Sequence, residues 1–224
     1  MANIEATLID SMGSDISVVN AARVSFGKSS QLVFTDDPDD YGSLSERDAK
    51  LINYLAKHKH ISPFGHAFAS FHIKAPIFVA RQLVKHKFLR WNEISRRYVD
   101  DEPEFYVPDV WRGRSADKKQ GSAGEVILDT LDKTIVSDSP YDALSAYKAL
   151  LKADVAPEQA RMVLPQSTMT EFYWSGSLDA FASMCVLRLK GDTQYETRLV
   201  AQQIDTIMKD LYPVSWVALI GETK

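Results

Sequence analysis

Residues 74–98, KAPIFVARQLVKHKFLRWNEISRRY, carry most of the information on the fold and chemistry of this chain. The residues just before, 67–73 (AFASFHI), alternate between apolar and polar, which predicts a half-buried strand. Pro76 suits the first turn of a helix, which we expect over residues 77–88. The sequence therefore predicts a strand that leads through a proline directly into a helix.

The same stretch concentrates positive charge. It holds seven Lys or Arg residues and a single acid, Glu93, in a chain whose net charge is −4. On the expected helix, Arg81 and Lys85 would share one face, and Gln82 and His86 would share the neighbouring face. Clustered cations and hydrogen-bond donors of this kind favour an anionic partner such as a phosphate.

Polar and aromatic residues accompany these cations. Asn92, Glu93 and Ser95 offer directional hydrogen bonds, and Trp91 and Tyr98 offer flat faces. Charge alone is equally well explained by a solvated basic face that balances the acidic residues after it. The added polar and aromatic groups favour a site that recognises a base.

The remaining segments mix helices and strands without regular alternation, which predicts an α+β fold. We expect helices over residues 16–24, 45–60, 139–153, 178–189 and 193–211, a short helix from Pro157, and strands over residues 104–107 and 168–174. The chain contains no internal repeat and no long linker. A single domain over residues 1–224 is therefore expected.

Local signals mark several boundaries. Asp15 is expected to cap the first helix, and Ser45 the second, with Asp48 completing an acidic variant of the capping box. Residues 35–42 (TDDPDDYG) read as a solvated acidic loop, since their acids lack an ordered spacing for metal ligands. Residues 111–124 are polar and contain glycine, which predicts a mobile loop.

Composition excludes several classes of protein. A net charge of −4 is unlike that of general nucleic-acid binders, which are basic. Cys185 is the single cysteine, so no internal disulfide can form. The first residues carry acids and no long apolar core, and no apolar run reaches the length of a membrane span. We expect a soluble, cytoplasmic protein.

Residues 85–98 (KHKFLRWNEISRRY) resemble the signature of flavin-dependent thymidylate synthases. That signature begins Arg-His-Arg and often continues through Asn-Glu-x-Ser-x-Arg-Tyr. The second half matches fully, whereas Lys85 and Lys87 replace the arginines. Further similarity spans most of the chain, at residues 21–26 (AARVSF), 60–66 (HISPFGH), 74–82 (KAPIFVARQ) and 160–165 (ARMVLP).

The resemblance implies a fold and an activity. Members of this family have a twisted, mainly antiparallel sheet flanked by helices, and they form homotetramers whose sites lie between subunits. They methylate dUMP to dTMP, with methylenetetrahydrofolate as carbon donor and NADPH-reduced FAD as hydride donor. No Gly-rich dinucleotide fingerprint is present, so NADPH would bind transiently.

The resemblance also implies binding residues. Positions that match the dUMP site are Gln82, Lys85, Glu93, Ser95, Arg96, Arg97, Arg161 and Arg188. Positions that match the FAD site are Ser62, Lys85, His86, Lys87, Glu93, Ser177 and Ser183, and His60 and Tyr98 also align with active-site positions. Arg188 matches the catalytic arginine, which polarises the uracil ring and makes C5 more nucleophilic.

Some of these residues have plainer explanations. Without the resemblance, Arg161 reads as a surface ion pair and Arg188 as a cation at a helix C-terminus. No histidine lies at an obvious activating position near Ser95, so we assign that serine to substrate binding rather than to nucleophilic attack. Cys185 lies in the apolar run SMCVLRL, which favours a buried, inert thiol.

Metal binding is not expected. His58, His60, His66 and His72 have suggestive spacings, but no carboxylate or cysteine joins them in a known ligand pattern.

Departures from the family cluster on the cofactor side. Besides the two lysines, Ser177 and Ser183 stand where asparagine is usual, and Asp179 stands where a basic residue is common. These departures leave open two alternative functions: a uridylate hydroxymethylase, or an inactive homologue that binds flavin and nucleotide. A single-stranded nucleic-acid binder is a further alternative, which the fixed order around Glu93 disfavours.

Overall fold

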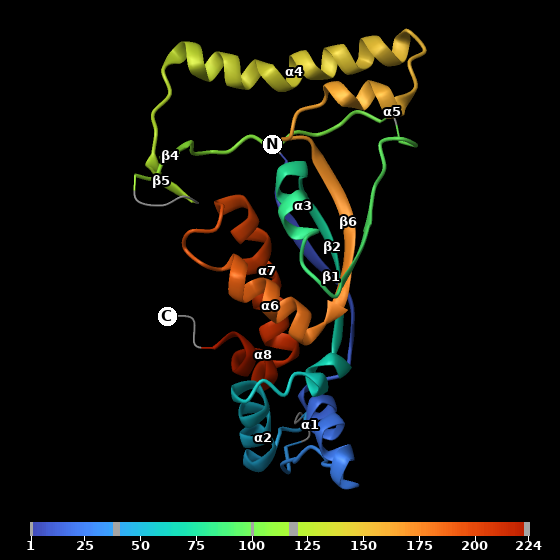
Figure 1. Ribbon diagram of the computed structural model, residues 1–224, viewed down its shortest axis with the longest axis vertical. Coiled ribbons are helices and arrows are strands. Elements are labelled where there is room, and N and C mark those ends of the chain that lie inside the picture. Colours follow the sequence, from blue (N-terminus) through green and yellow to red (C-terminus); the bar gives the residue numbers. More distant parts are fainter. Residues whose placement is uncertain (1, 38–40, 100, 117–120, 222–224) are drawn as a thin grey trace.

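The computed structural model describes residues 2–37, 41–99, 101–116 and 121–221 (Figure 1). A four-stranded sheet forms its centre, in the order β1-β2-β6-β3. These strands are β1 (Glu5–Met12), β2 (Phe68–Pro76), β6 (Met169–Ser177) and β3 (Leu89–Glu93). Every neighbouring pair is antiparallel, which confirms the predicted α+β fold with a mainly antiparallel sheet.

The expected strands over residues 67–73 and 168–174 are confirmed as β2 and β6. Inward-facing residues alternate along both, because successive side chains of a strand point to opposite faces. Gly176 of β6 lies opposite Leu89 of β3, where an added Cβ would come within 2.4 Å of the leucine Cδ2. The sheet therefore holds β3 closely at its edge.

Helices α6 (Leu178–Arg188) and α7 (Tyr195–Leu211) contact the sheet and each other, and α8 (Pro213–Ile220) packs on both helices. The expected helices over residues 178–189 and 193–211 are thus confirmed, whereas α8 was not predicted. The main core lies between these helices and the sheet, with Phe71, Trp174 and Phe181 in edge-to-face contact.

At one end of the molecule lie α1 (Asp15–Arg23) and α2 (Glu46–Lys57) with the short 3-10 turns η1 (Val24–Phe26) and η2 (Ser62–His66) (Figure 1). Ser45 accepts a hydrogen bond from the Asp48 backbone N–H at 3.2 Å, which confirms the second predicted cap. The predicted cap of the first helix by Asp15 is wrong. Ser14 is the N-cap of α1, and Asp15 instead accepts hydrogen bonds from the backbone N–H groups of Val214 and Ser215, each at 2.9 Å.

At the opposite end lie α4 (Thr130–Lys152), α5 (Pro157–Ala160) and η3 (Arg161–Val163), with the hairpin of β4 (Arg112–Arg114) and β5 (Ser122–Glu125) (Figure 1). Helix α4 begins well before the predicted start at residue 139. Asp129 caps it by accepting from the Asp132 N–H at 2.8 Å, and Pro140 is accommodated inside the helix. A small separate core joins α4 to α5 around Tyr147 and Ala160.

Three further predictions need correction. Helix α3 (Ile77–Leu83) ends five residues before residue 88, so Lys85 and His86 share no helix face with Arg81 and Gln82. Residues 104–107 contribute a single bridge, Phe105 to Thr168, rather than a strand. Within residues 111–124, where a mobile loop was expected, residues 112–114 and 122–124 belong to the paired strands β4 and β5.

The expected acidic and polar loops include residues 38–40 and 117–120, which lie outside the described residues. Within the described part of the chain, no helix is both long and apolar enough to cross a membrane.

Candidate active site

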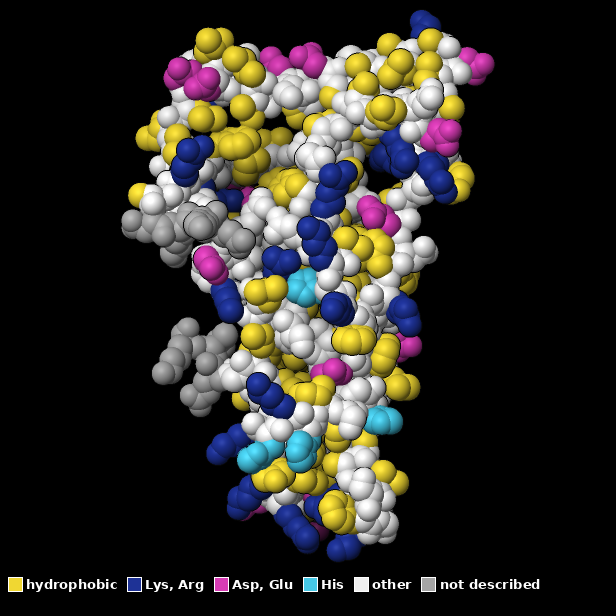
Figure 2. All heavy atoms as spheres, viewed as in Figure 1, with side chains coloured by type: hydrophobic (Ala, Val, Ile, Leu, Met, Phe, Trp, Pro, Cys, Tyr) yellow, Lys and Arg dark blue, Asp and Glu magenta, His cyan; other side chains and the backbone are white. Residues whose placement is uncertain are grey.

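The charged stretch forms a turn and an edge strand. Helix α3 ends at Leu83, a tight turn follows, and β3 begins at Leu89. Phe88 closes that turn with a φ of 65°, a left-handed conformation that non-glycine residues seldom adopt, and its side chain is exposed. On the face of the molecule shown in Figure 2, Lys and Arg side chains gather in the middle, over α3 and the region that follows it.

A cavity of about 440 Å³ opens where the end of α3, the end of α6 and the start of α7 meet. Among the predicted dUMP residues, Gln82, Lys85 and Arg188 line it. The sequence did not point to Lys190 and Gln194, which line it as well. Both residues follow α6 and belong to no recognisable motif, so only the folded structure shows that they line the cavity.

Arg188 is fixed in this wall by two hydrogen bonds. Its Nε donates to His86 Nε2 at 2.9 Å, and its Nη2 donates to the backbone oxygen of Gln82 at 2.9 Å. The Gln82 side chain in turn donates to Gln194 Oε1 at 2.5 Å. The guanidinium is therefore oriented before any ligand arrives.

Burial shapes the protonation of this pair. Burial, and secondarily the Arg188 cation, lowers the pKa of His86 from 6.5 to about 4. His86 is therefore neutral near pH 7, with a lone pair on Nε2 to accept the arginine N–H. Burial also lowers the pKa of Arg188, which remains a cation at neutral pH.

Glu93 is anchored on β3 by both carboxylate oxygens. Thr170 Oγ1 donates to Oε1 at 2.7 Å, and Trp91 Nε1 donates to Oε2 at 3.0 Å. Trp91 itself stacks on Phe172 with ring centroids 3.5 Å apart. Trp91, which the sequence suggested as a flat face for a base, therefore packs on the sheet and holds Glu93.

The other predicted dUMP residues lie outside the cavity. Ser95 Oγ accepts from the Arg97 backbone N–H at 3.4 Å, and Arg97 donates to the Tyr98 hydroxyl. Arg96 donates to the backbone oxygen of Asp101 at 2.9 Å. Arg161 is exposed and donates to the Glu158 backbone oxygen of its own turn, at 3.2 Å. Helix α5 and the turn η3 both contact α4, and Figure 1 shows α5 beside α4 and away from α6.

The predicted FAD residues are also spread over several elements. Ser62 begins η2, Ser177 is the N-cap residue of α6, and Ser183 donates to the Asp179 backbone oxygen at 2.8 Å. Lys85 and Lys87 are exposed on the turn before β3. His60 lies beside Tyr54, with ring centroids 6.0 Å apart. Their elements nevertheless meet in part, because η2 contacts both β6 and α6, and the turn at Phe88 lies beside Gly176 of β6.

Cys185 has the properties of an inert thiol. It is fully buried, and burial raises its pKa well above 9.0. Among the histidines with suggestive spacing, His72 pairs with Glu171 at 3.0 Å, and His58 packs against Tyr54 with centroids 4.2 Å apart. The described residues contain no cluster of three side chains suited to a metal ion.

Fold and cavity together define an α+β protein with a pre-oriented arginine at a polar cavity. A family profile described as "Thy1: Thymidylate synthase complementing protein" matches residues 7–214. The flavin-dependent thymidylate synthase of Thermus thermophilus is 41% identical over 211 residues, covering 94% of this chain and 73% of that protein. The protein of the same name from Kosmotoga olearia is 40% identical over 219 residues, covering 96% and 89%.

The fold agrees with that of a solved relative. The UMP/dUMP methylase PolB from Streptomyces cacaoi, bound with 5-Br UMP, superposes with a TM-score of 0.81 at 32% identity, covering 97% of this chain and 94% of PolB. The chain belongs to the flavin-dependent thymidylate synthase family.

Proposed function

We propose that this protein converts dUMP into dTMP, with methylenetetrahydrofolate as carbon donor and NADPH-reduced FAD as hydride donor. The observation that carries the proposal is Arg188, held at the cavity wall by His86 and the Gln82 backbone. Family membership supports the same activity.

Arg188 is the proposed catalytic residue. Its guanidinium is oriented in advance and partly buried, so its charge acts strongly on a neighbouring ring. A cation beside the pyrimidine favours the ionised ring and raises electron density at C5, where the new carbon attaches. Gln82 and Lys85 line the same cavity and are suited to hold the polar edge and the charge of the nucleotide.

We propose that the complete site forms between subunits of a homotetramer. Ser95, Arg96, Arg97 and Arg161 do not line the Arg188 cavity of the same chain, and we expect a second chain to bring them to one nucleotide. Exposed apolar side chains on and before α4 support association: Ile127, Leu131, Ile135 and Tyr141.

Mixing of inactive variants tests the shared site. Arg188→Ala and Arg161→Ala proteins, each inactive alone, are unfolded and refolded together. Partial recovery of activity in mixed oligomers supports a site made by two chains. No recovery, with mixed oligomers demonstrated, contradicts it. Light scattering is expected to give about four times the 25.1 kDa of one chain.

The donor set fits a flavin dinucleotide. Exposed Lys85 and Lys87 suit its phosphates, and the hydroxyls of Ser62 and Ser177 suit its polar atoms, although lysine gives single-point contacts where arginine would give forked ones. When bound, reduced FAD supplies the hydride. Glu93, fixed by Thr170 and Trp91, and His86 complete the proposed contacts.

We further propose that residues 1–224 form one domain in the cytoplasm. The main core, which includes side chains from Ile4 to Trp216, supports a single domain, and reduced cofactors favour a reducing compartment. If the chain is one domain, two spectroscopic probes should report the same single, cooperative unfolding transition. Cell fractionation tests the cytoplasmic location.

Mass spectrometry of the nucleotide product tests the activity. Purified protein is incubated with dUMP, methylenetetrahydrofolate, FAD and NADPH, with FAD omitted in one control and Arg188→Ala protein in another. FAD-dependent dTMP in the first reaction alone is expected. Unchanged dUMP, with folded protein and verified cofactors, refutes the proposal. A hydroxymethylated nucleotide in place of dTMP also refutes it.

A further inference from the structure

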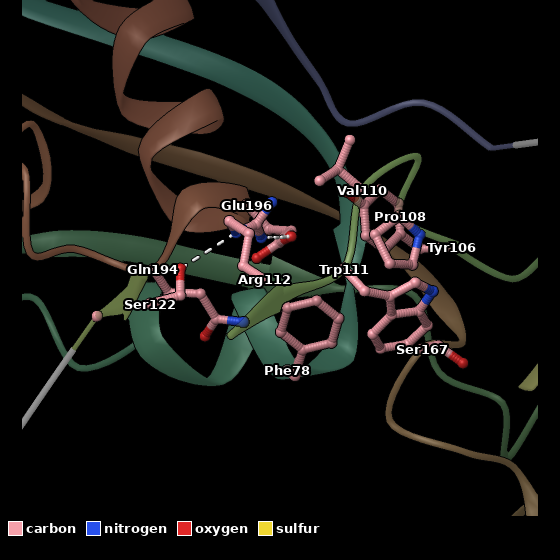
Figure 3. A pocket seen from close by; sticks show the side chains of 11 residues that line it. Phe78, Tyr106, Pro108, Val110, Trp111, Arg112, Ser122, Ser167, Gln194 and Glu196 are labelled. Carbon is pink, nitrogen blue, oxygen red and sulfur yellow. Dashed lines mark hydrogen bonds and ion pairs between the residues drawn. The ribbon is translucent and has the colours of Figure 1, made fainter. Parts of the chain in front are cut away.

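A second cavity, of about 480 Å³, adjoins the Arg188 cavity. Gln194 lines both. The second cavity is bounded by Phe78, Tyr106 and Trp111 on its aromatic side, and by Arg112 and Glu196 at its polar end (Figure 3). Its size lies within the range of small-molecule sites.

The polar end is rigid. Arg112 Nη2 forms an ion pair with Glu196 Oε1, and its Nε donates to Ser122 Oγ at 3.2 Å. The guanidinium also lies over the Tyr195 ring, 4.5 Å from its centroid. Hairpin β4–β5 and helix α7 therefore hold the arginine in one orientation.

Glu196 has an unused oxygen. The residue is 3% exposed, and its Oε2 is buried without a hydrogen-bond partner among the described residues. A buried acceptor without a partner costs about 1–3 kcal/mol, so native proteins seldom leave one unpaired. At the wall of a cavity, such an oxygen is suited to a donor that arrives with a ligand.

Aromatic rings favour a flat ligand. Phe78 and Tyr106 meet edge to face with centroids 6.2 Å apart, and Trp111, 41% exposed, lines the same space. Burial raises the pKa of Tyr106 to about 12, so its hydroxyl stays protonated at neutral pH. Flat apolar walls with polar groups at one end are typical of sites for heterocycles.

We propose that this cavity binds a planar nitrogen heterocycle whose edge carries an N–H donor next to an acceptor, as a nucleobase or a pterin does. The ring N–H donates to Glu196 Oε2, and the neighbouring acceptor faces the Arg112 guanidinium. Because Arg112 balances the charge of Glu196, the ring itself is neutral. The site depends on Glu196 and not on Arg188, so it stands independently of the proposed turnover.

Binding of free heterocycles tests this site. Saturation-transfer NMR is recorded with guanosine and with pterin, on protein saturated with dUMP so that the nucleotide cavity is filled. At least one of the two probes is expected to bind, and whichever binds identifies the source of the ring. 1-Methylguanosine, in which a methyl group replaces the N1 hydrogen, is expected to bind at least about ten-fold more weakly than guanosine if guanosine binds.

Variants locate the probe. Glu196→Gln leaves an amide N–H donor where the ring needs an acceptor, so affinity is expected to fall about ten-fold or more. Trp111→Ala removes a partly exposed wall and is expected to weaken binding without unfolding the protein. Glu46→Gln, at an exposed pair on α2, is the control and leaves affinity unchanged. Absence of binding by both probes overturns the proposal, as does equal affinity in the folded Glu196 and Trp111 variants.

Discussion

His86 Nε2 accepts a hydrogen bond from Arg188 Nε at 2.9 Å, across 102 positions of sequence. The histidine is neutral because burial and the adjacent cation disfavour its protonation. An imidazolium could not accept this hydrogen bond and would repel the arginine. The turn before β3 therefore sets the orientation of a residue at the end of α6, and His86 acts as a positioning residue for Arg188.

Replacement of this histidine tests that role. His86→Ala removes a hydrogen bond to a charged group, which corresponds to about 1.5–3 kcal/mol. We expect kcat for dTMP formation to fall roughly ten-fold or more, with a smaller change in the KM for dUMP, and steady-state kinetics measure both. His58→Ala, at the end of α2, is the control. If the His86 and His58 variants have equal kcat, the positioning role is wrong.

Stability should depend on pH through the same residue. His86 titrates near 6.5 when unfolded and about 4 when folded, so between these values the unfolded chain binds more protons. Its contribution to the free energy of unfolding is therefore fully present above about pH 6.5 and is lost as the pH falls towards 4. Urea denaturation at pH 7, 5.5 and 4.5 measures this dependence. His86→Gln, which cannot titrate, should show a shallower decline; an identical slope would contradict the lowered pKa.

Asp15 links the two ends of the chain. Its carboxylate, at the start of α1, accepts hydrogen bonds from the backbone N–H groups of Val214 and Ser215. These N–H groups lie in the first turn of α8, where the helix itself offers them no partner. Asp15→Ala is expected to lower the free energy of unfolding by about 1–3 kcal/mol. Chemical denaturation measures the loss. Asp210→Ala, exposed on α7, should change stability little, and a similar loss in both variants would argue against the cap.

Cys185 should be chemically silent. Because it is fully buried and its pKa is raised, a thiol reagent such as Ellman's reagent should react slowly with native protein and rapidly in denaturant. Cys185→Ala should retain most dTMP formation once folded, since the thiol has no part in the proposed chemistry. Loss of all turnover in a folded Cys185→Ala protein would point instead to a cysteine nucleophile.

Sequence reasoning succeeded where local signals decide structure. The cap at Ser45, the alternation in residues 67–73 and the apolar pattern of α6 depend on near neighbours, and each prediction was confirmed. It failed where partners lie elsewhere. Strand β3 (LRWNE) is rich in polar residues and exists through its pairing with β6. The turn that leads into β3 ends helix α3 at Leu83, before the predicted end at residue 88.

The sequence by itself determined the chemical inventory and the family: the KHKFLRWNEISRRY stretch, a single thiol, and enough apolar pattern for an α+β fold. Tertiary structure alone decided which of these groups meet. His86 with Arg188 and Arg112 with Glu196 are contacts between distant segments, and the Glu196 oxygen that has no partner among the described residues is buried only in the folded chain. Local propensity acts over a few residues, whereas such contacts depend on how whole elements pack against one another.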